Sequence, residues 1–201
     1  ITDVSAFLPN AAVGNDEMER ILGQVGDRPS RARRTVLRSN GIRSRHYAID
    51  PLSLQANYTN ATMTAEAVRS LDGGQLSLAD IECLCCGTSI PDQILPNHAS
   101  MVQGELQMHH CEAIAASGVC ASSVAALKYA YLSVLAGATA NAVATGSDAP
   151  SALLSARNFR AEIDAAVKAL NKRPELAFEK DFLRWMLSDG AGAMLLQNKP
   201  A

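Results

Sequence analysis

One segment of the sequence constrains the fold more than any other, because it joins an apolar run to a long helix through a very short turn. The run 112–116 predicts a short buried strand, and the Ser-Gly pair that follows it predicts a tight turn. Residues 120–136 are rich in Ala, Leu and Tyr and predict a helix, which Gly137 ends. A strand that turns directly into a helix is typical of layered α/β folds, so we expect the helix to cover the sheet that contains the strand.

Further strands and helices alternate along the chain. The continuous apolar run 81–88 predicts a strand that is buried on both faces, and 141–147 predicts another strand. Helices are expected over 63–71, after an N-cap at Thr62, and over 97–106. This alternation predicts an α/β fold with a mostly parallel sheet, and 201 residues suffice for one domain with a substantial core.

The composition excludes several classes of function. The net charge of −2 gives no general attraction to nucleic acid or to anionic membranes. No apolar run approaches the roughly 18 residues of a membrane span and no signal peptide is recognised, so we expect a cytoplasmic protein. The five cysteines are an odd number, which favours free thiols. Because Cys83, Cys85 and Cys86 lie along one strand and cannot converge on one ion, no metal site and no cofactor are expected.

Cys120 stands at the first turn of the predicted helix and is the candidate nucleophile. Free backbone N–H groups and the positive end of the helix dipole at this position favour a thiolate over a thiol. The small residues around it, among them Gly118, Ala121 and Ser122, leave room for a substrate to reach the sulfur. The alternative is a buried structural cysteine at the start of a core helix. The segment by itself leaves both interpretations open.

Three further segments occur in a fixed order around this one. Residues 1–9 predict a first strand that precedes a short acidic helix over 15–23, residues 39–45 read SNGIRSR, and residues 188–196 read SDGAGAMLL. The second is similar to a TGI-x-x-R loop and the third to a GDGAGA turn and strand. With the nucleophile segment between them, they resemble the thiolase superfamily, and within it condensing enzymes of the beta-ketoacyl synthase III type, over essentially all 201 residues.

The resemblance implies that residues 1–201 are the N-terminal half of a thiolase-like fold, a five-stranded mixed sheet with helices on both faces. Members of the family have two similar halves. The C-terminal half is therefore expected outside this chain, which is either a fragment or one subunit of a split enzyme. The complete protein is expected to be a homodimer. By resemblance, residues 24–60 and 151–180, with a predicted helix over 161–170, shape the acyl tunnel and its mouth.

The resemblance also implies a reaction. Cys120 would carry an acyl group as a thioester, and a second, malonyl-type thioester would lose CO2 and attack it, in fatty acid or polyketide-type biosynthesis. The His and Asn that assist this condensation come, by resemblance, from the C-terminal half. Two alternatives stay open: an acyltransferase that makes esters or amides without decarboxylation, and a non-catalytic partner subunit. Because degenerate subunits usually lose the cysteine, Cys120 favours an enzyme.

A cluster of arginines is the predicted carrier-binding element. By resemblance, its segment lies near the entrance for the phosphopantetheine arm, so the cluster is expected to attract an acyl carrier protein or the phosphates of acyl-CoA. The alternative is a solvated loop with local ion pairs. The absence of an aromatic residue in 29–34, where many relatives carry a Trp that stacks on the CoA adenine, favours carrier-bound substrates. The predicted binding residues are Arg33, Arg34, Arg43 and Arg45, within a cluster that also includes Arg28, Arg31 and Arg38.

The remaining expectations concern single positions. His98 is expected at the surface or at an interface, and His109 and His110 in a loop. Leu95 replaces a Glu that marks the family branch joining two acyl chains head to head. The amino-acid sequence of residues 182–190 resembles instead the branch that makes dialkylresorcinol or aryl-polyene products. Within this segment, Trp185 is expected in the core or in the acyl tunnel.

Overall fold

The computed structural model describes residues 1–25, 30, 33–71, 77–159 and 182–198. The chain folds into two compact units, each with its own hydrophobic core. Unit 1 consists of Ile1–Pro9, Tyr58–Ala149 and Gly190–Ala201, and unit 2 consists of Asn10–Asn57 and Pro150–Asp189. None of the helices in the described part of the chain has the length and hydropathy needed to cross a membrane.

A five-stranded sheet forms the centre of unit 1, as predicted. Its strands are β1 Asp3–Phe7, β4 Cys83–Gly87, β5 Glu112–Ala116, β6 Asn141–Asp148 and β7 Gly190–Gln197. They are ordered β1-β7-β6-β4-β5, with β4 parallel to β5 and β6 and with β7 antiparallel to β1 and β6. The sheet is therefore mixed, and its strand β4 is buried at every position, as its apolar sequence predicts.

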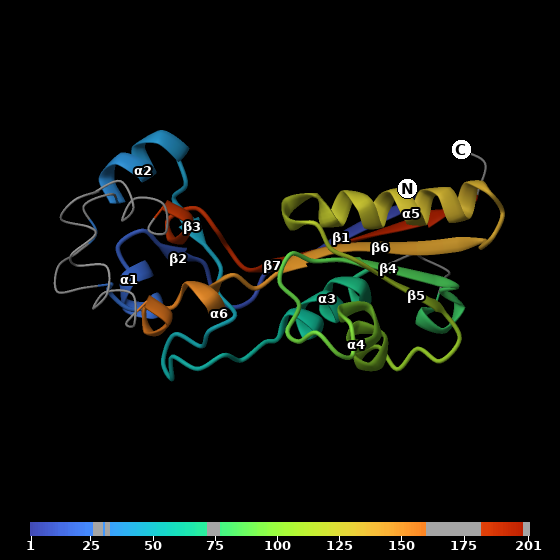
Figure 1. Ribbon diagram of the computed structural model, residues 1–201, viewed down its shortest axis with the longest axis horizontal. Helices are drawn as coiled ribbons and strands as arrows, with labels where there is room; N and C mark the ends of the chain where they lie inside the picture. The colour runs from blue at the N-terminus through green and yellow to red at the C-terminus, as the bar shows by residue number, and fades with distance from the viewer. Residues whose placement is uncertain (26–29, 31–32, 72–76, 160–181, 199–201) are drawn as a thin grey trace. The chain divides into compact units, whose positions relative to one another are not determined.

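Helices cover both faces of this sheet (Figure 1). The long helix α5, Ser122–Leu135, lies on one face, while α3, Asn60–Arg69, and α4, His98–Glu105, lie on the other. A capping box starts α3 at Thr59, and the predicted N-cap Thr62 is instead the third residue of the helix, which completes that box. A short 3-10 turn, η1, precedes β4 at Leu78–Asp80.

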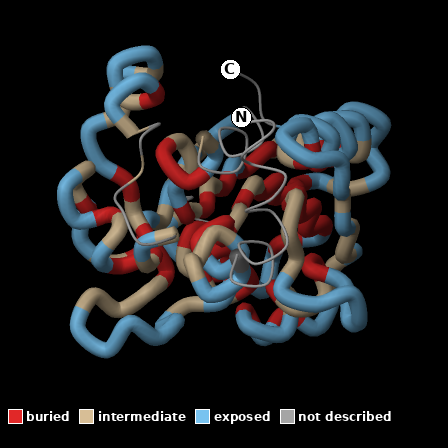
Figure 2. The backbone as a smooth tube through the Cα atoms, turned by 60° about the vertical axis from the view of Figure 1, so that its left-hand side comes forward, coloured by how far each residue is buried: buried red, intermediate tan, exposed pale blue. Residues whose placement is uncertain are grey.

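Small side chains dominate the contact between α5 and the sheet. The helix buries one stripe, every fourth residue from Ser122 to Val134, and exposes most of its other positions (Figure 2). Since the separation between packed elements follows the size of the side chains between them, this layer is thin. The buried hydrophobic residues between α5 and the sheet are Cys83, Cys85, Ala126, Ala130, Val134, Ala142, Ala144 and Leu196.

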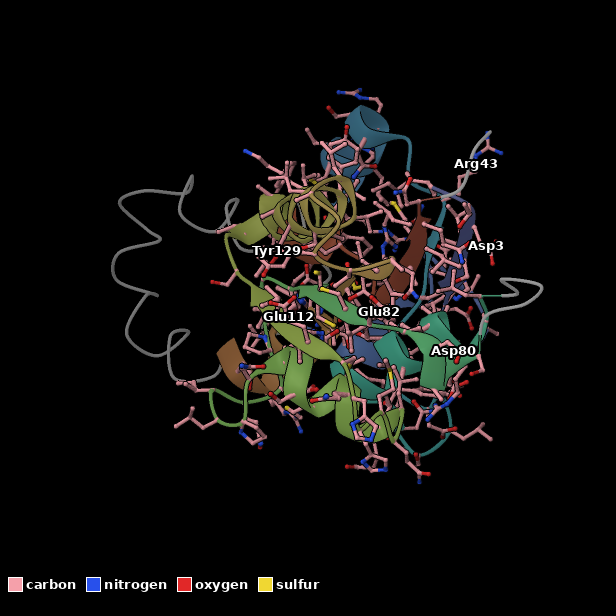
Figure 3. The ribbon with its side chains drawn as sticks, turned by 90° about the vertical axis from the view of Figure 1, so that its right-hand side faces the viewer. Asp3, Arg43, Asp80, Glu82, Glu112 and Tyr129 are labelled. Atoms are coloured by element: carbon pink, nitrogen blue, oxygen red, sulfur yellow. The ribbon has the colours of Figure 1, made fainter. Side chains whose placement is uncertain are left out.

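The strand that leads to Cys120 lies at the edge of the sheet. β5 pairs with β4, and no other strand in the described ranges pairs with it. Glu112 and Ala115 are exposed, so the prediction of a buried strand is wrong: an edge strand packs on one neighbour and leaves part of its surface open. The Tyr129 hydroxyl of α5 donates a hydrogen bond of 2.7 Å to Glu112 and thereby ties this edge to the helix (Figure 3).

Unit 2 is built from short elements around Trp185, which is fully buried, as the core prediction for this residue requires. The antiparallel pair of β2 and β3 is its only sheet among the residues described. Asp189 is also buried here, and its carboxylate accepts backbone hydrogen bonds from Ala48 at 2.6 Å and Ser151 at 2.9 Å. The elements are β2 Val13–Gly14, α1 Met18–Leu22, α2 Arg33–Asn40, β3 Ser44–Arg45, α6 Ser151–Leu154 and the 3-10 turn η3 Ala156–Phe159.

Two expectations for unit 2 need correction. The predicted acidic helix over 15–23 is confirmed but shorter, since α1 covers Met18–Leu22. No helix is predicted within residues 24–60, yet α2 lies there; it buries only Val36, too few apolar positions for a recognisable helical period. The predicted helix over 161–170 falls outside the described residues.

Candidate active site

Cys120 is exposed and lies in a 3-10 turn, η2 Val119–Ala121, between the end of β5 and the start of α5. Exposure at a strand–turn–helix junction is what a nucleophile needs, whereas a structural cysteine in the core would be buried. Two left-handed residues make the turn, Gly118 with φ of 152° and Val119 with φ of 52°. Glycine adopts such angles freely, but a β-branched residue rarely does, so the backbone before Cys120 is strained.

Hydrogen bonds fix the backbone on both sides of the sulfur. The Ala121 amide donates to the Gly118 carbonyl at 3.2 Å. The Val119 carbonyl accepts two bonds from Ser122, one from its amide and one of 2.8 Å from its hydroxyl. The Cys120 amide has no hydrogen-bond acceptor among the described residues. An open N–H group beside an exposed sulfur can stabilise the oxyanion that forms when a thioester carbonyl is attacked.

Two glycines of the sheet let the first turn of α5 approach closely. A methyl group on Gly87 of β4 would lie 2.5 Å from the carbonyl carbon and oxygen of Ser122 and 2.6 Å from the amide nitrogen of Ser123. A methyl group on Gly146 of β6 would overlap the Ser123 Cβ. The start of the nucleophile helix therefore rests directly on the backbone of two strands.

The other four cysteines are less accessible or less acidic than an alkylating reagent requires. Cys83, Cys85 and Cys86 are fully buried and Cys111 is half-buried, all as free thiols. A hydrogen bond with Cys85 and burial raise the pKa of Cys83, and burial raises the pKa of Cys86 to about 12 and that of Cys111 above its usual value. Among the described cysteines, Cys120 is the exposed one.

The loop after β4 is fastened at two points. The Asp148 carboxylate, at the end of β6, accepts bonds from Ser89 through its amide and hydroxyl, both at 2.9 Å. The Asp92 carboxylate accepts the amides of the first two residues of α3, each at 2.8 Å. Between Asp92 and α4, Ile94 and Leu95 are 85% and 82% exposed. That Leu95 separates this chain from the branch that joins two acyl chains head to head stays a prediction.

The histidines divide between core and surface. His109 and His110 are exposed in the loop before β5, as predicted. The prediction that His98 lies at the surface or at an interface is wrong, because the residue is buried inside the chain: its Nε2 lies 3.1 Å from the Ser147 hydroxyl and 3.3 Å from that of Thr64. Burial lowers the pKa of His98, against weaker raising effects of the Asp92 and Asp148 carboxylates.

The predicted arginine cluster separates into buried and exposed members. Arg45 is buried in unit 2, donates to the Trp185 carbonyl and the Asn15 side chain at 2.8 Å each, and has a pKa lowered by desolvation. Arg33 pairs with Asp16, and its guanidinium lies 5.4 Å from the centroid of the Trp185 ring. These contacts favour a structural role for both arginines.

Arg34 and Arg43 are exposed, and neither has an ion-pair partner within the described ranges. The Arg43 side chain extends away from the backbone (Figure 3). Arg28 and Arg31 fall outside the described residues. Carrier binding by the four arginines stays a prediction, and Arg34 and Arg43 are the members whose charge is open to a partner.

The sequence did not point to Gly87, Gly146 or the hydroxyl of Ser122. A glycine inside an apolar strand often marks the close approach of another backbone, so the two glycines carried a usable signal. The Ser122 bond carried none, because it depends on the left-handed turn at Val119, an angle that no periodicity predicts.

Comparison with known proteins identifies the relatives of this arrangement. Residues 60–201 match the family model of the beta-ketoacyl synthase N-terminal domain. This chain belongs to the beta-ketoacyl synthase family. Within it, the chain is 30% identical over 148 residues to beta-ketoacyl-[acyl-carrier-protein] synthase III of Dinoroseobacter shibae and 32% identical over 155 residues to the enzyme of the same name from Roseobacter denitrificans.

The family match explains the fold. A tetronic acid condensing enzyme superposes on the whole chain with a TM-score of 0.77 at 24% identity, and 3-oxoacyl-(acyl carrier protein) synthase III of Pseudomonas aeruginosa does so with 0.71 at 21%. The chain covers 55% and 50% of these two structures. The sequence matches cover 74% of this chain and 42% of the Dinoroseobacter relative, and 77% of this chain and 44% of the Roseobacter one. The chain thus spans about half the length of its relatives and corresponds to their N-terminal half.

Proposed function

We propose that this chain carries the nucleophile of an acyl-transferring condensing enzyme, and that Cys120 is that nucleophile. The observation that carries the proposal is an exposed cysteine at the start of α5 whose own amide N–H is open. Membership of the beta-ketoacyl synthase family supports it. The buried and half-buried cysteines elsewhere offer no comparable sulfur in the described residues.

In the proposed loading step, the Cys120 thiolate attacks the carbonyl carbon of an acyl thioester. The new carbon–sulfur bond forms as the carbonyl electrons move onto oxygen, where the Cys120 N–H stabilises the developing charge. The carbonyl then reforms, the bond to the donor thiol breaks, and the donor leaves as a thiolate that takes a proton from solvent. A malonyl-type thioester would next lose CO2, and its carbanion would attack the acyl carbon, assisted by a His and an Asn of the C-terminal half. The bond from that carbon to Cys120 Sγ would then break, which releases the product and returns the Cys120 thiolate.

Mass spectrometry of the full-length protein tests the loading step. Incubation with an acyl-N-acetylcysteamine thioester should add one acyl mass, located at Cys120 by peptide mapping. Cys120→Ala should abolish the adduct, whereas Cys111→Ala, which removes a half-buried thiol, should keep it. Iodoacetamide at mild pH should label Cys120 before the buried thiols of β4. An acyl adduct that persists in Cys120→Ala would refute the proposal.

The proposed acyl donor is an acyl carrier protein in the cytoplasm, with acyl-CoA as the weaker alternative. The exposed charges of Arg34 and Arg43 support attraction of an acidic carrier surface. Arg34→Glu and Arg43→Glu should lower kcat/KM for carrier-bound donors and leave loading from the small thioester unchanged, with Arg157→Glu as a control at another exposed site of unit 2. Because salt screens charges beyond roughly 8 Å, the preference should weaken as salt rises. Equal, salt-independent use of both donors would refute carrier steering.

The choice between condensation and simple acyl transfer depends on the second step. A condensing enzyme releases CO2 from a malonyl thioester in proportion to product, and a non-condensing acyltransferase does not. A non-catalytic subunit would not load an acyl group at all. The proposed products are of the dialkylresorcinol or aryl-polyene type, because the amino-acid sequence of residues 182–190 resembles that branch of the family. A homodimer of the complete protein is proposed with it.

A further inference from the structure

The peptide bond that precedes Cys120 is held in an unusual orientation. Val119 has a φ of 52°, which places a β-branched residue in the left-handed region. Its side chain is 70% exposed, so packing of the side chain does not hold this angle. A contact made with the backbone of Val119 therefore has to keep the strained conformation from relaxing.

The hydroxyl of Ser122 supplies that restraint. Ser122 is buried, and its Oγ donates a hydrogen bond of 2.8 Å to the Val119 carbonyl, which also accepts the Ser122 amide. The side chain makes no second hydrogen bond within the described part of the chain. One residue therefore holds one carbonyl oxygen with two donors.

The geometry of the peptide unit transmits this restraint to the neighbouring amide. In a planar trans peptide the carbonyl and the N–H of the next residue point in opposite directions. With the Val119 oxygen drawn toward the first turn of α5, the Cys120 N–H points away from the helix, and it has no acceptor among the described residues. Rotation of this peptide would turn the N–H away from the place where the oxyanion of the attacked thioester forms.

We propose that Ser122 is a positioning residue for acyl transfer at Cys120. Its hydroxyl keeps the Val119–Cys120 peptide in the orientation that aims the Cys120 N–H at the carbonyl oxygen of the incoming thioester. This inference rests on the proposed function and adds to it a residue that does not touch the substrate. The reaction is unchanged: Cys120 Sγ bonds to the acyl carbon, the donor carbon–sulfur bond breaks, and the donor thiolate takes a proton from solvent.

Two reactions of the same sulfur separate positioning from general support of the fold. Acyl transfer from a thioester passes through an oxyanion and needs the N–H. Alkylation by iodoacetamide displaces iodide from a saturated carbon and forms no oxyanion, so it depends only on the thiolate and its accessibility. A residue that merely stabilises the start of α5 would affect both rates together.

The test compares Ser122→Ala with Ser123→Ala in the full-length protein. Alanine preserves most of the volume of serine and has high helix propensity, so both variants should fold. Ser123 is the matched control because its hydroxyl makes no hydrogen bond among the described residues. Single-turnover loading from an acyl-N-acetylcysteamine thioester and alkylation by iodoacetamide are measured as functions of pH.

Ser122→Ala should lower the loading rate about tenfold, a fraction of the 10²–10³ lost when an oxyanion donor is removed outright. The rate of alkylation of Ser122→Ala, and its dependence on pH, should stay within about twofold of the parent. Ser123→Ala should match the parent in both reactions. Ser122→Thr, which retains a hydroxyl, should recover most of the loading rate.

Loading and alkylation that fall together in Ser122→Ala would overturn the inference, as would unchanged loading. Neither result affects the proposed function, which fails only if Cys120→Ala still forms the acyl adduct. The two ideas are therefore refuted by different variants.

Discussion

Adding one methyl group to Gly87 should destabilise the protein, because the space that it would enter is filled by backbone. The new Cβ would lie 2.5 Å from the Ser122 carbonyl carbon and oxygen, whereas ordinary contacts begin at 3.4 Å. The start of α5 or strand β4 therefore has to move by about 0.9 Å, the difference between these distances. Overpacking of this kind costs about 1–3 kcal/mol, and atoms of a helix turn yield less than a side chain does, so we expect about 3 kcal/mol.

Gly104 provides the control, since the same chemical change there meets nothing. It lies in α4, is exposed, and a methyl group added to it would have no atom within 4 Å apart from the backbone of its own helix and its chain neighbours. Gly104→Ala should raise stability by about 0.5–1 kcal/mol through helix propensity. For a protein about twice the length of this chain, a change of 1 kcal/mol moves Tm by about 1–2 °C, so Gly87→Ala should lower Tm by about 3–6 °C while Gly104→Ala raises it by about 0.5–2 °C.

Calorimetry or urea denaturation of the full-length protein measures both changes. The acyl-loading rate adds a second readout, because the clash lies within the first turn after Cys120. Gly87→Ala should slow loading and Gly104→Ala should not. A Gly87→Ala variant within about 0.5 kcal/mol of the parent, with normal loading, would show that the helix start is not held by this contact.

Three further changes have expected outcomes. Gly146→Ala should destabilise the protein by about 1–3 kcal/mol, and adding Ser123→Gly should recover part of the loss measured by denaturation, since the clash is with the Ser123 Cβ; additive losses would contradict the contact. Burial lowers the pKa of His98 from 6.5, against weaker raising effects of two nearby carboxylates, so the contribution of the neutral ring to the free energy of unfolding is intact above pH 6.5 and is lost as the pH falls toward the pKa of the folded state. His98→Gln should flatten the pH dependence of the unfolding free energy, measured with urea, in that window, and an unchanged slope would contradict the assignment. Asp189→Asn should cost about 2–3 kcal/mol in urea unfolding, because the amide keeps only one of the two buried oxygens that accept the Ala48 and Ser151 amides and turns an NH2 group toward the other donor. A neutral result would show that these contacts are dispensable.

The order of strands and helices in unit 1 was predictable because each element carries a local signal. The apolar run of β4 reports a strand covered on both sides, and the Asn97 cap marks the start of α4 within one residue of the prediction. The edge position of β5 had no such signal, since Glu112–Ala116 is apolar enough to suggest burial. Which strand ends a sheet is decided by pairing over long sequence distances, which no local pattern reports.

The reactive atom of the candidate site was predictable from the sequence, but the burial of the arginines and of His98 was not. Helix position and small neighbours pointed to Cys120, which the structure leaves exposed. The arginines were grouped by sequence proximity, yet Arg45 faces the core and Arg43 faces solvent two residues away, because sequence proximity does not decide which way a side chain points. His98 was misplaced for a similar reason: the partners that make its burial tolerable, Thr64 and Ser147, are far away in sequence.

The thin layer beneath α5 has an entropic consequence. An alanine side chain has no rotamers to lose on folding, so ordering it costs nothing beyond its backbone, whereas a core of Leu and Met would lose conformational freedom at every position. Four of the eight buried residues in this layer, Ala126, Ala130, Ala142 and Ala144, have no side-chain torsion to fix on folding. The platform that carries Cys120 therefore loses little side-chain entropy when it forms, and more of the free energy gained by burying it is left to hold the sulfur in place.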